Sequence, residues 1–322
     1  MHYLLITTKG TNFGDDAVCQ GIKNIVLSVD RNASFVLINK ENQSEWSKPI
    51  PFDKAIWCGM PLFWSYGGDT TSTISWWKFL IGWVSQIKNN FIILGAGSFC
   101  PWKNEIDTLQ NREQLIKSVE MLKNRSYKIS VRDSVANKIT KQNFEILVCP
   151  SIAALENIKS TNSPIKIVNI MPDGSHYKVF NSKEAECWKG KKYLLADFAR
   201  DNNYTFVAHN KEEHCEAIKL GFHKIILPKS LSEFLSTYKR CRYYIGNRIH
   251  GSLLAKAAGA KIINIGYDSR QECVNLVNGK TYFPSEVTIN ILNDFETSPQ
   301  NNIGCLTIIQ RYKTIIREFQ NV

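Results

Sequence analysis

Several features that mark common classes of protein are missing from this chain of 322 residues. It has no run of about eighteen apolar residues, so it predicts no membrane-spanning helix. The apolar segment near its start, residues 4–8, is too short for the core of a secretory signal peptide. Its nine cysteines form no C-x-x-C pair and are scattered, which favours reduced thiols over disulfides or a zinc site. These absences predict a cytoplasmic protein.

Common catalytic and cofactor motifs are missing too. There is no G-x-S-x-G nucleophile elbow, no Walker A motif and no H-E-x-x-H, and the glycines at 95 and 97 lack the third glycine of a dinucleotide-binding loop. No D-x-D pair could hold a divalent cation for a nucleotide-sugar, and the histidines have no metal-ligand spacing. We therefore expect no metal and no cofactor, and an anion site built from arginines, a histidine and helix ends.

The chain carries a formal charge of +11, which predicts an anionic partner. Nucleic acid, a phospholipid surface and a phosphorylated substrate all fit this charge. The lysines are spread along the chain, however, and no RNP-type aromatic motif or basic recognition helix is present. We therefore expect no nucleic-acid partner. Hydrophobic residues at 43 % and charged residues at 21 % are typical of an ordinary globular protein.

Strand-like runs alternate with helical patterns, which is typical of parallel sheets covered by helices. A polar, turn-forming segment at 156–164 divides the alternation into an N-terminal domain (1–157) and a C-terminal domain (164–304). Residues 305–322 predict a terminal helix that packs back on the N-terminal domain. Since ligands of such sheets bind beyond the carboxyl ends of the strands, the predicted fold is two Rossmann-like α/β domains facing each other across a cleft, a glycosyltransferase-B-like arrangement. The strands are predicted at 3–8, 34–39, 54–58, 91–94, 128–132, 146–149, 165–170, 205–208, 224–227, 243–245 and 261–265.

One stretch, residues 242–268, places polar residues between a buried strand and a helix rich in alanine and leucine. Asn247, Arg248 and His250 then lie at the helix N-terminus, where unpaired backbone N–H groups and the helix dipole favour a phosphate or carboxylate. Gly251 would allow close approach of the backbone to that anion. The alternative is a surface arginine followed by a capping histidine.

Two further candidates also follow predicted strands. In the loop at 9–16, Asp15 or Asp16 stands at the start of a helix, where a carboxylate caps the helix and opposes its dipole. Arg132 ends a strand, and its guanidinium suits a carboxylate or phosphate; the alternative is an ion pair with Asp133, which we expect to cap the next helix.

These segments resemble those of a known family. Asn247-Arg-Ile-His-Gly251, followed by a small-residue helix and Gly-Tyr267-Asp268-Ser-Arg, is similar to the "R-L-H" and "Y-D-x-K" segments of the polysaccharide pyruvyltransferase family. Asn12-Phe-Gly-Asp15 resembles its "N-x-G-D", and Arg132-Asp-Ser its "R-D-x-x-S". The resemblance runs from residue 12 to residue 270. Cys149-Pro150-Ser151 departs from it, because an aspartate commonly follows the proline in that family.

The resemblance implies transfer of pyruvate from phosphoenolpyruvate to a sugar of a bacterial-type surface polysaccharide (exopolysaccharide or capsule) or its lipid-linked precursor, forming a pyruvate ketal and releasing phosphate. In that reading phosphoenolpyruvate is the donor, a glycan or lipid-linked oligosaccharide is the acceptor, and His250 and Asp15 are catalytic. Two alternatives stay open: a glycosyltransferase with a nucleotide-sugar donor, and a noncatalytic glycan-binding protein. The residues expected to bind substrates are Asn12, Gly14, Arg132, Asn247, Arg248, Ile249, Gly251, Tyr267 and Asp268.

A tryptophan-rich helix is predicted at 73–88. Its apolar face, which includes Trp76 and Trp83, is typical of a helix that packs on a core. Three tryptophans flanked by lysines also suit a helix at a membrane surface, which would help an enzyme with a lipid-linked acceptor. Trp76, Trp77 and Trp83 are therefore candidates for peripheral contact with the inner face of the cell membrane.

Overall fold

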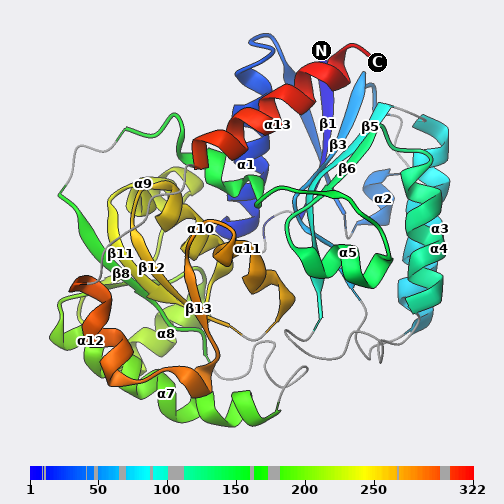
Figure 1. The fold of residues 1–322 in the computed structure, drawn as a ribbon. Coiled ribbons are helices and arrows are strands. Elements are labelled where there is room, and N and C mark those ends of the chain that lie inside the picture. The colour runs from blue at the N-terminus through cyan, green and yellow to red at the C-terminus, as the bar shows by residue number, and fades with distance from the viewer. Residues whose placement is uncertain are drawn as a thin grey trace.

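The computed structural model of the chain contains two parallel β-sheets, each covered by helices, that lie beside one another (Figure 1). This confirms the predicted fold of two Rossmann-like α/β units. The link between them runs through a short 3-10 helix, η3 (Pro150–Leu155). The structure describes residues 1–8, 10, 12–40, 42–46, 50–64, 70–87, 90–100, 112–159, 163–172, 182–266, 268–297 and 305–322.

The first sheet contains seven of the described strands, and all of its pairings are parallel. They are β1 (His2–Thr7), β2 (Ser34–Asn39), β3 (Lys54–Cys58), β4 (Pro61–Trp64), β5 (Phe91–Phe99), β6 (Lys128–Val131) and β7 (Glu145–Ile146). Their order is β2-β1-β3-β5-β6-β7, with β4 paired to β5. The order reverses between β1 and β3, and ligands of open α/β sheets bind at such a switch point.

Helices cover both faces of this sheet, so its central strands are buried on both sides and consist largely of apolar residues. On one face Leu80, Val119 and Ile139, from three of these helices, join one apolar core. The other face packs on α1 (Phe13–Leu27), η3 and the C-terminal helix α13 (Cys305–Gln320). The other described helices of this half are α2 (Gln43–Trp46), α3 (Thr70–Ile87), α4 (Arg112–Lys123) and α5 (Ser134–Thr140).

The second sheet contains six described strands, again all parallel. They are β8 (Ile165–Asn169), β9 (Thr205–Val207), β10 (Ile225–Ile226), β11 (Cys241–Gly246), β12 (Lys261–Ile265) and β13 (Lys280–Tyr282). Their order, β10-β9-β8-β11-β12-β13, is that of a dinucleotide-binding sheet with its switch point between β8 and β11. The helices are α7 (Ser182–Asp201), α8 (Lys211–Lys219), α9 (Leu231–Lys239), α10 (Ile249–Ala257), α11 (Glu272–Asn275) and α12 (Ile289–Thr297), with the short η4 (Ser269–Gln271) and η5 (Pro284–Glu286).

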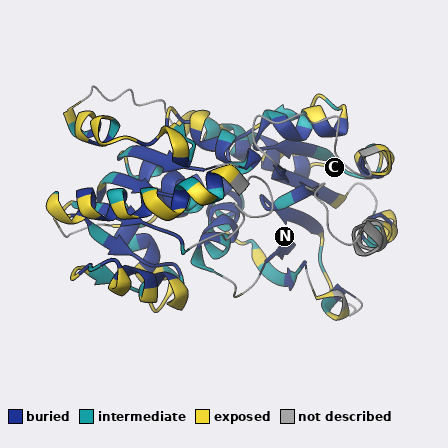
Figure 2. Ribbon diagram, turned by 90° about the horizontal axis from the view of Figure 1, so that it is seen from below, coloured by how far each residue is buried: buried dark blue, intermediate teal, exposed yellow. Residues whose placement is uncertain are grey.

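A single apolar core joins the two halves of the molecule, that is, each sheet with the helices that cover it. Buried residues of both sheets belong to the same packed cluster. Helix α1 lies so close to η3 that a methyl group at Gly21 would fall 2.0 Å from the carbonyl oxygen of Pro150. The strands and the inner helices are buried while exposed residues collect on the outer helices (Figure 2). The contact between the two halves therefore includes a closely packed apolar core.

Polar contacts also cross between the halves. The hydroxyl groups of Ser98 on β5 and Ser269 on η4 lie 2.6 Å apart, and the backbone N–H of Ser269 donates to Cys100. The carboxylate of Glu272 on α11 accepts from the backbone N–H of Ser134 (2.8 Å) at the start of α5. These hydrogen bonds fix the second sheet against the carboxyl ends of β5 and β6.

Helix α13 crosses over the first half at the top of Figure 1, next to α1. The hydroxyl of its Tyr312 donates to the carbonyl of Val148 (2.8 Å), and its Gln320 donates to the hydroxyl of Tyr3 (2.8 Å). Arg311 pairs with Glu145 on β7. The last helix thus covers the segment that leads into η3.

Helix α3 packs on the first sheet. Its Leu80 and Val84 are fully buried, and Trp83 makes edge contacts with Trp46 (4.9 Å between ring centres) and Phe91 (6.1 Å). Trp83 therefore belongs to the margin of the core. The side chains of Trp76 and Trp77 lie outside the described residues. Among those that are described, no helix combines the length and the apolar character needed to cross a bilayer.

Most predicted strands are present, and most of their ends are shifted by two residues or fewer, but β5, predicted at 91–94, extends to Phe99. The strand expected at 146–149 is an exception: β7 stops at Ile146, and Cys149 stands in the turn before η3. Proline at 150 disfavours further strand pairing because it has no N–H to donate. Sequence analysis did not predict β4, β13, α2, α11 and α12, of which all but α12 are only three or four residues long.

Candidate active site at the junction of the two sheets

The residues singled out in the sequence lie where strands of both sheets end. Residues 12–15 follow β1, and Arg132 follows β6 directly. On the second sheet, residues 247–251 follow β11, and Asp268 follows β12. Because the carboxyl ends of parallel strands share one edge of a sheet, each sheet gathers its candidates at one edge. The contacts described below show that these two edges meet.

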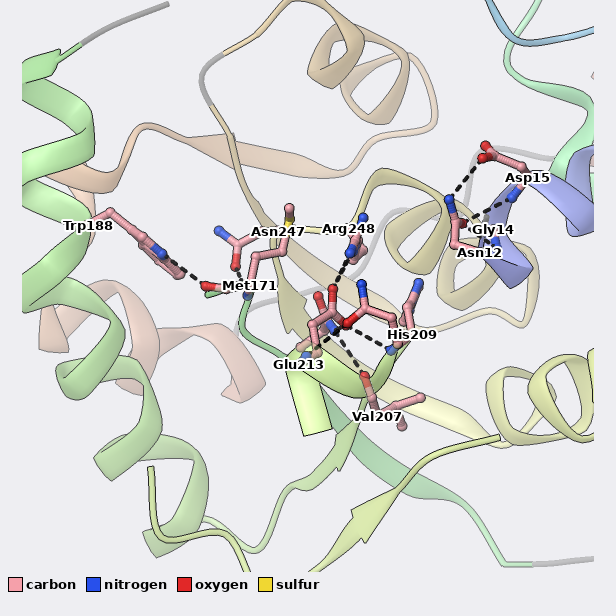
Figure 3. A network of polar contacts seen from close by, with 12 residues as sticks. Asn12, Gly14, Asp15, Met171, Trp188, Val207, His209, Glu213, Asn247 and Arg248 are labelled. Carbon is pink, nitrogen blue, oxygen red and sulfur yellow. Dashed lines mark hydrogen bonds and ion pairs between the residues drawn. The ribbon is translucent and has the colours of Figure 1, made fainter. Parts of the chain in front are cut away.

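Asn12 fixes the start of α1. Its side-chain oxygen accepts from the backbone N–H groups of Gly14 (2.8 Å) and Asp15 (3.2 Å), which is the usual role of an N-cap. Its amide also donates to the carboxylate of Asp15 (2.8 Å). Figure 3 shows Asn12 and Asp15 facing each other at the tip of the helix. The cap therefore orients the carboxylate that was predicted to be catalytic.

His250 reaches this helix from the second sheet. Its Nδ1 lies 3.8 Å from Oδ1 of Asp15, although the two residues belong to different sheets. A methyl group at Gly14 would lie only 2.7 Å from the same Nδ1, so the glycine makes room for the imidazole. Burial lowers the pKa of His250, and the positive charges of Arg132 and Arg270 lower it further. The two predicted catalytic residues are brought together.

A third side chain, which the sequence did not single out, completes this group. The thiol of Cys149 is fully buried and lies near enough to His250 for each group to shift the pKa of the other. Burial raises the pKa of Cys149, but its interaction with the imidazole and the positive charges of His250 and Arg132 outweigh burial and bring the pKa to about 6. Ser151 also lowers the pKa of this thiol. The carboxylate of Asp15, the imidazole of His250 and the thiol of Cys149 therefore lie next to one another in space.

Arg132 stands on the other side of the thiol. Only 1 % of the residue is exposed, and its Nη1 donates to the carbonyl of Gly59 (3.0 Å) and lies 3.9 Å from the sulfur of Cys149. The guanidinium rests against Gly97, where a methyl group would come within 2.2 Å of Nε. Among the described residues, no carboxylate forms an ion pair with it. The site therefore contains a buried guanidinium for which the described part of the chain supplies no carboxylate partner.

The sequence alternative, an ion pair between Arg132 and Asp133, is wrong. The Asp133 carboxylate accepts from the backbone N–H and the hydroxyl of Ser98 (2.9 and 2.6 Å) and from the N–H of Ala136 (2.8 Å), so it caps α5 as expected. Burial raises the pKa of Asp133 to about 6, although the hydrogen bonds from Ser98 oppose that shift. Asp133 supports the junction through Ser98, which also contacts Ser269.

Unlike Arg132, Arg248 is paired with a carboxylate. Its Nε donates to Glu213 (2.5 Å), its Nη2 forms an ion pair with the same carboxylate, and Glu213 is fully buried. The other carboxylate oxygen accepts from the amide of Asn169 (2.8 Å) and the backbone N–H of His209 (2.8 Å). Figure 3 shows Glu213 at the centre of these contacts with Arg248 above it. The guanidinium is held in place at the N-cap of α10, and the side chain of Arg248 is 23 % exposed.

The neighbours of Arg248 have structural contacts of their own. The side chain of Asn247 accepts from the N–H of Met171 (3.2 Å), which ties β11 to the end of β8. Ile249 is buried at the first position of α10. A methyl group at Gly251 would lie 2.5 Å from the hydroxyl of Tyr244, so this glycine is explained by packing inside the domain. Substrate contact by these three residues stays a prediction.

The segment after β12 supplies a second paired arginine. Asp268 is fully buried and accepts from Nε (2.9 Å) and Nη2 (2.8 Å) of Arg270, whose guanidinium lies over the ring of Phe99 at 4.5 Å. Asp268 is thus an orienting residue for Arg270, which sequence analysis did not name as a candidate. Tyr267, another predicted substrate contact, lies outside the described residues.

Three buried polar atoms near Cys149 make no regular hydrogen bond with the described residues: Nε of Arg132, Oγ of Ser151 and Nε2 of His250. Native proteins pair nearly all buried polar atoms, and exceptions gather where a ligand or water completes the set. These three come from both sheets and from the link between them. They mark the point where a polar ligand would be bound.

The sequence did not single out Cys149, Gly97, Glu213 or Arg270 as site residues. Cys149 carried a usable signal, since it ends a predicted strand just as Arg132 does, but its neighbours Pro150 and Ser151 departed from the family pattern. Glu213 carried no local signal, because its partner Arg248 lies 35 positions away in the chain.

Comparison with protein families gives one assignment. The family model described as polysaccharide pyruvyl transferase matches residues 12–269, which is more than half of the chain. The chain belongs to the polysaccharide pyruvyl transferase family. The resemblance found in the short motifs is thereby confirmed, and the matched region contains every site residue described above except Arg270. The comparison with curated proteins found no significant match.

Solved structures with a similar fold are UDP-GlcNAc 2-epimerases. The enzyme of Methanocaldococcus jannaschii, in complex with UDP-GlcNAc and UDP, has a TM-score of 0.58 and 11 % identity, with 100 % of both chains covered. The enzyme of Neisseria meningitidis, bound to UDP-GlcNAc, has a TM-score of 0.54 and 12 % identity, also with 100 % of both chains covered. At this identity the likeness shows the glycosyltransferase-B-like fold alone.

In this member of the polysaccharide pyruvyl transferase family, the separated family segments meet at one place. The N-x-G-D segment provides Asp15, the R-I-H segment provides His250, and the R-D segment provides Arg132. The two-sheet fold explains this meeting, because each segment follows a strand whose carboxyl end faces the junction.

Proposed function

We propose that this transferase moves pyruvate from phosphoenolpyruvate to a sugar of a surface polysaccharide or its lipid-linked precursor, forming a pyruvate ketal and releasing phosphate. The observation that carries the proposal is the buried guanidinium of Arg132, which has no carboxylate partner among the described residues and stands beside the Cys149–His250–Asp15 group. Family membership supports the same activity.

The donor would complete the electrostatics of the site. Burying an unpaired cation is costly, so a buried arginine gains most from an anionic ligand that replaces the lost water. Phosphoenolpyruvate offers both a carboxylate and a phosphate, which a guanidinium binds through paired hydrogen bonds. Arg248, held by Glu213 at the N-cap of α10, would present its remaining nitrogen and the helix N-terminus to the second anionic group.

The proposed chemistry begins with proton transfer from His250 to the methylene carbon of the donor. The adjacent carbon becomes oxocarbenium-like, a sugar hydroxyl adds to it, and Asp15 or the neutral imidazole takes the hydroxyl proton. Phosphate leaves with the electrons of its bond to that carbon and takes up a proton. A second hydroxyl of the same sugar then adds and closes the ketal, and its proton returns to the site. Arg132 stabilises the negative charge of the departing phosphate.

The runner-up is a glycosyltransferase that uses a nucleotide-sugar. The specific observation in its favour is that the solved structures of the same fold were obtained with UDP-GlcNAc or UDP. A nucleotide-sugar also carries phosphates that arginines bind, so the two donors are separated by their products.

The deciding experiment incubates the full-length protein with a panel of free and lipid-linked oligosaccharides. One series contains phosphoenolpyruvate, and phosphate release is followed together with the mass of the glycan. A parallel series contains UDP-sugars, and nucleotide release is followed. We expect glycan-dependent phosphate release and a glycan that gains one pyruvate ketal. Nucleotide release would instead favour the glycosyltransferase, and binding of glycan without either product would favour a noncatalytic role.

A further inference from the structure

A cavity of about 650 Å³ lies between the two halves of the molecule, apart from the candidate active site. Its walls come from the ends of α1 and α13 in the first half, from the ends of α9 and α10 in the second half, and from η3, which links them (Figure 1). A cavity of this size is typical of a site for a small molecule.

Two helices extend from the candidate active site to this cavity. Helix α1 begins beside Asp15, and Leu27 at its other end lines the cavity. At a rise of 1.5 Å per residue, a helix of that length separates the two places by about 20 Å. Helix α10 begins at His250 and its neighbours, and its last turn lines the cavity with Lys256. The cavity is therefore distinct from the place where Asp15 and His250 meet.

Basic side chains outnumber acidic ones in the cavity wall. Among the described residues that form it there are three lysines, Lys239, Lys256 and Lys313, and one carboxylate, that of Glu156. Lys313 forms an ion pair with Glu156 (3.0 Å), while Nζ of Lys239 donates to the carbonyl of Leu155 (3.4 Å). The excess of positive charge favours an anion in the cavity.

Lys256 is the most deeply placed of these lysines, since only 5 % of the residue is exposed. Burial lowers the pKa of its ammonium group because the charged form loses water. Cys305, which faces it from α13, stays a neutral thiol because burial raises its pKa. An anion bound in the cavity would stabilise the charged form of Lys256, which burial disfavours.

The rest of the wall is largely apolar. Leu27, Ile152, Leu155 and Ile309 all line the cavity, and the last three are at most 4 % exposed. A bare inorganic anion would leave these side chains facing water, whereas a ligand with an apolar body would cover them. The wall therefore matches an anion that also carries an apolar group.

We propose that this cavity is a second ligand site, which binds an organic phosphate. Lys239 and Lys256 bind the phosphate group, and the apolar body packs on η3 and the first turns of α13. Two lysines suit the double charge of a phosphate monoester better than the single charge of a carboxylate. This site goes beyond the proposed function, because none of its residues belongs to the candidate active site.

The test uses 1-naphthyl phosphate as the probe and 1-naphthol as its neutral counterpart, each titrated calorimetrically into the full-length protein. We expect the phosphate to bind and the naphthol to bind much more weakly. Lys239→Met and Lys256→Met should each weaken binding of the phosphate by roughly tenfold or more, because each removes a charge-assisted contact. Lys219→Met is the matched control, since Lys219 is exposed at the end of α8 and does not line the cavity.

Glu156→Gln should act in the opposite direction. It removes the carboxylate that pairs with Lys313, so affinity for 1-naphthyl phosphate should rise by a few-fold. Equal binding of naphthol and its phosphate, or lysine variants that bind the phosphate like the wild type, would overturn the proposal. Lys239→Met, at a half-buried position, keeps the test valid if Lys256→Met does not fold.

Arg132→Ala separates this site from the candidate active site. The variant should bind 1-naphthyl phosphate as the wild type does; loss of binding there, with binding retained in Lys256→Met, would place the probe at the active site and overturn the proposal. Since phosphoenolpyruvate takes no part in these titrations, failure of the proposed function would leave their result unchanged.

A second arm identifies the source of the phosphate. The protein is sedimented with vesicles of phosphatidylcholine, with and without phosphatidic acid. Retention that requires phosphatidic acid and is lost in Lys256→Met would support the site and identify a lipid phosphate. Binding of the soluble probe without retention on vesicles would support a soluble ligand. Binding to neither would overturn the proposal.

Discussion

The two halves of the site hold their arginines in opposite ways. On the first sheet, Arg132 is 1 % exposed and faces the thiol of Cys149 and the carbonyl oxygen of Gly59, with no carboxylate partner among the described residues. On the second sheet, Arg248 is paired with the fully buried Glu213, and Arg270 is paired with the fully buried Asp268. In the first half, no described carboxylate neutralises the charge of Arg132. In the second half, the charges of Arg248 and Arg270 are neutralised by carboxylates of the same half.

This difference assigns separate tasks to the two halves. A buried ion pair whose remaining oxygens accept hydrogen bonds is rigid, and removing one member leaves a costly lone charge. Glu213 and its four hydrogen-bonding or ionic contacts therefore act as a frame for the N-terminus of α10. An unpaired buried cation contributes little to folding and is suited to a ligand. His250 connects the two, since its helix belongs to the frame and its imidazole lies among the reactive groups.

The largest effect is expected from His250→Gln. Glutamine keeps a hydrogen-bonding side chain but cannot donate a proton near neutral pH, so turnover should fall by roughly 10² to 10⁴, while donor affinity changes much less. Turnover, donor affinity and melting temperature are measured on the same variant. A purely structural role would give the reverse pattern, with a lower melting temperature and turnover largely retained.

The next effect concerns the frame. Arg248→Ala leaves the carboxylate of Glu213 buried without its cation, which should destabilise the protein by about 3–5 kcal/mol. Denaturant unfolding of Arg248→Ala is compared with that of Arg248→Met combined with Glu213→Gln, which removes both charges. If Arg248→Ala is as stable as the wild type, Arg248 does not stabilise the buried carboxylate of Glu213, and the contrast with Arg132 fails.

Arg132→Ala tests the other half. It removes a cation that has no carboxylate partner among the described residues, so stability without donor should change less than for Arg248→Ala. Affinity for phosphoenolpyruvate should fall by about 2–3 kcal/mol, the range for a hydrogen bond to a charged group. Calorimetric titration with the donor measures this, with Arg200→Ala as a control on the far side of the second sheet. Unchanged donor affinity would remove Arg132 from the donor site.

A smaller effect is expected from Gly97→Ala, which tests whether the space at Gly97 determines the position of the Arg132 guanidinium. The new methyl group would lie 2.2 Å from Nε, so the guanidinium must shift, at a cost of about 1–3 kcal/mol in folding or donor binding. Gly82→Ala is the matched control, because a methyl group there meets no atom within 4 Å and the position is exposed in helix α3. If the two variants bind donor and unfold alike, Gly97 does not determine the position of Arg132.

The smallest effect is expected from a chelator. Neither half of the site offers a group of three or more Asp, Glu, His or Cys side chains arranged to hold a metal ion, within the residues that the structure describes. Turnover should therefore be unchanged in excess chelator. Loss of activity that magnesium restores would point to the nucleotide-sugar alternative.

The amino-acid sequence by itself determined the two-sheet α/β fold and the strand ends at which Asp15, Arg132 and His250 stand. Both follow from local information, because the spacing of apolar residues along the chain indicates where strands and helices form. Parallel sheets then bring the carboxyl ends of their strands to one edge. The cap formed by Asn12 and the cap formed by Asp133 are local in the same sense.

Only the tertiary structure decided how the charges are partnered. Arg132 could be matched with Asp133 on sequence spacing, but the carboxylate turns to Ser98 and the guanidinium to Cys149. Arg248 finds Glu213 at a separation of 35 residues, and Cys149 meets His250 across the junction of the two sheets. Such contacts depend on strand order, on the packing of α1 against η3 and on which atoms burial leaves without water, and none of these can be read from residues that are neighbours in the chain.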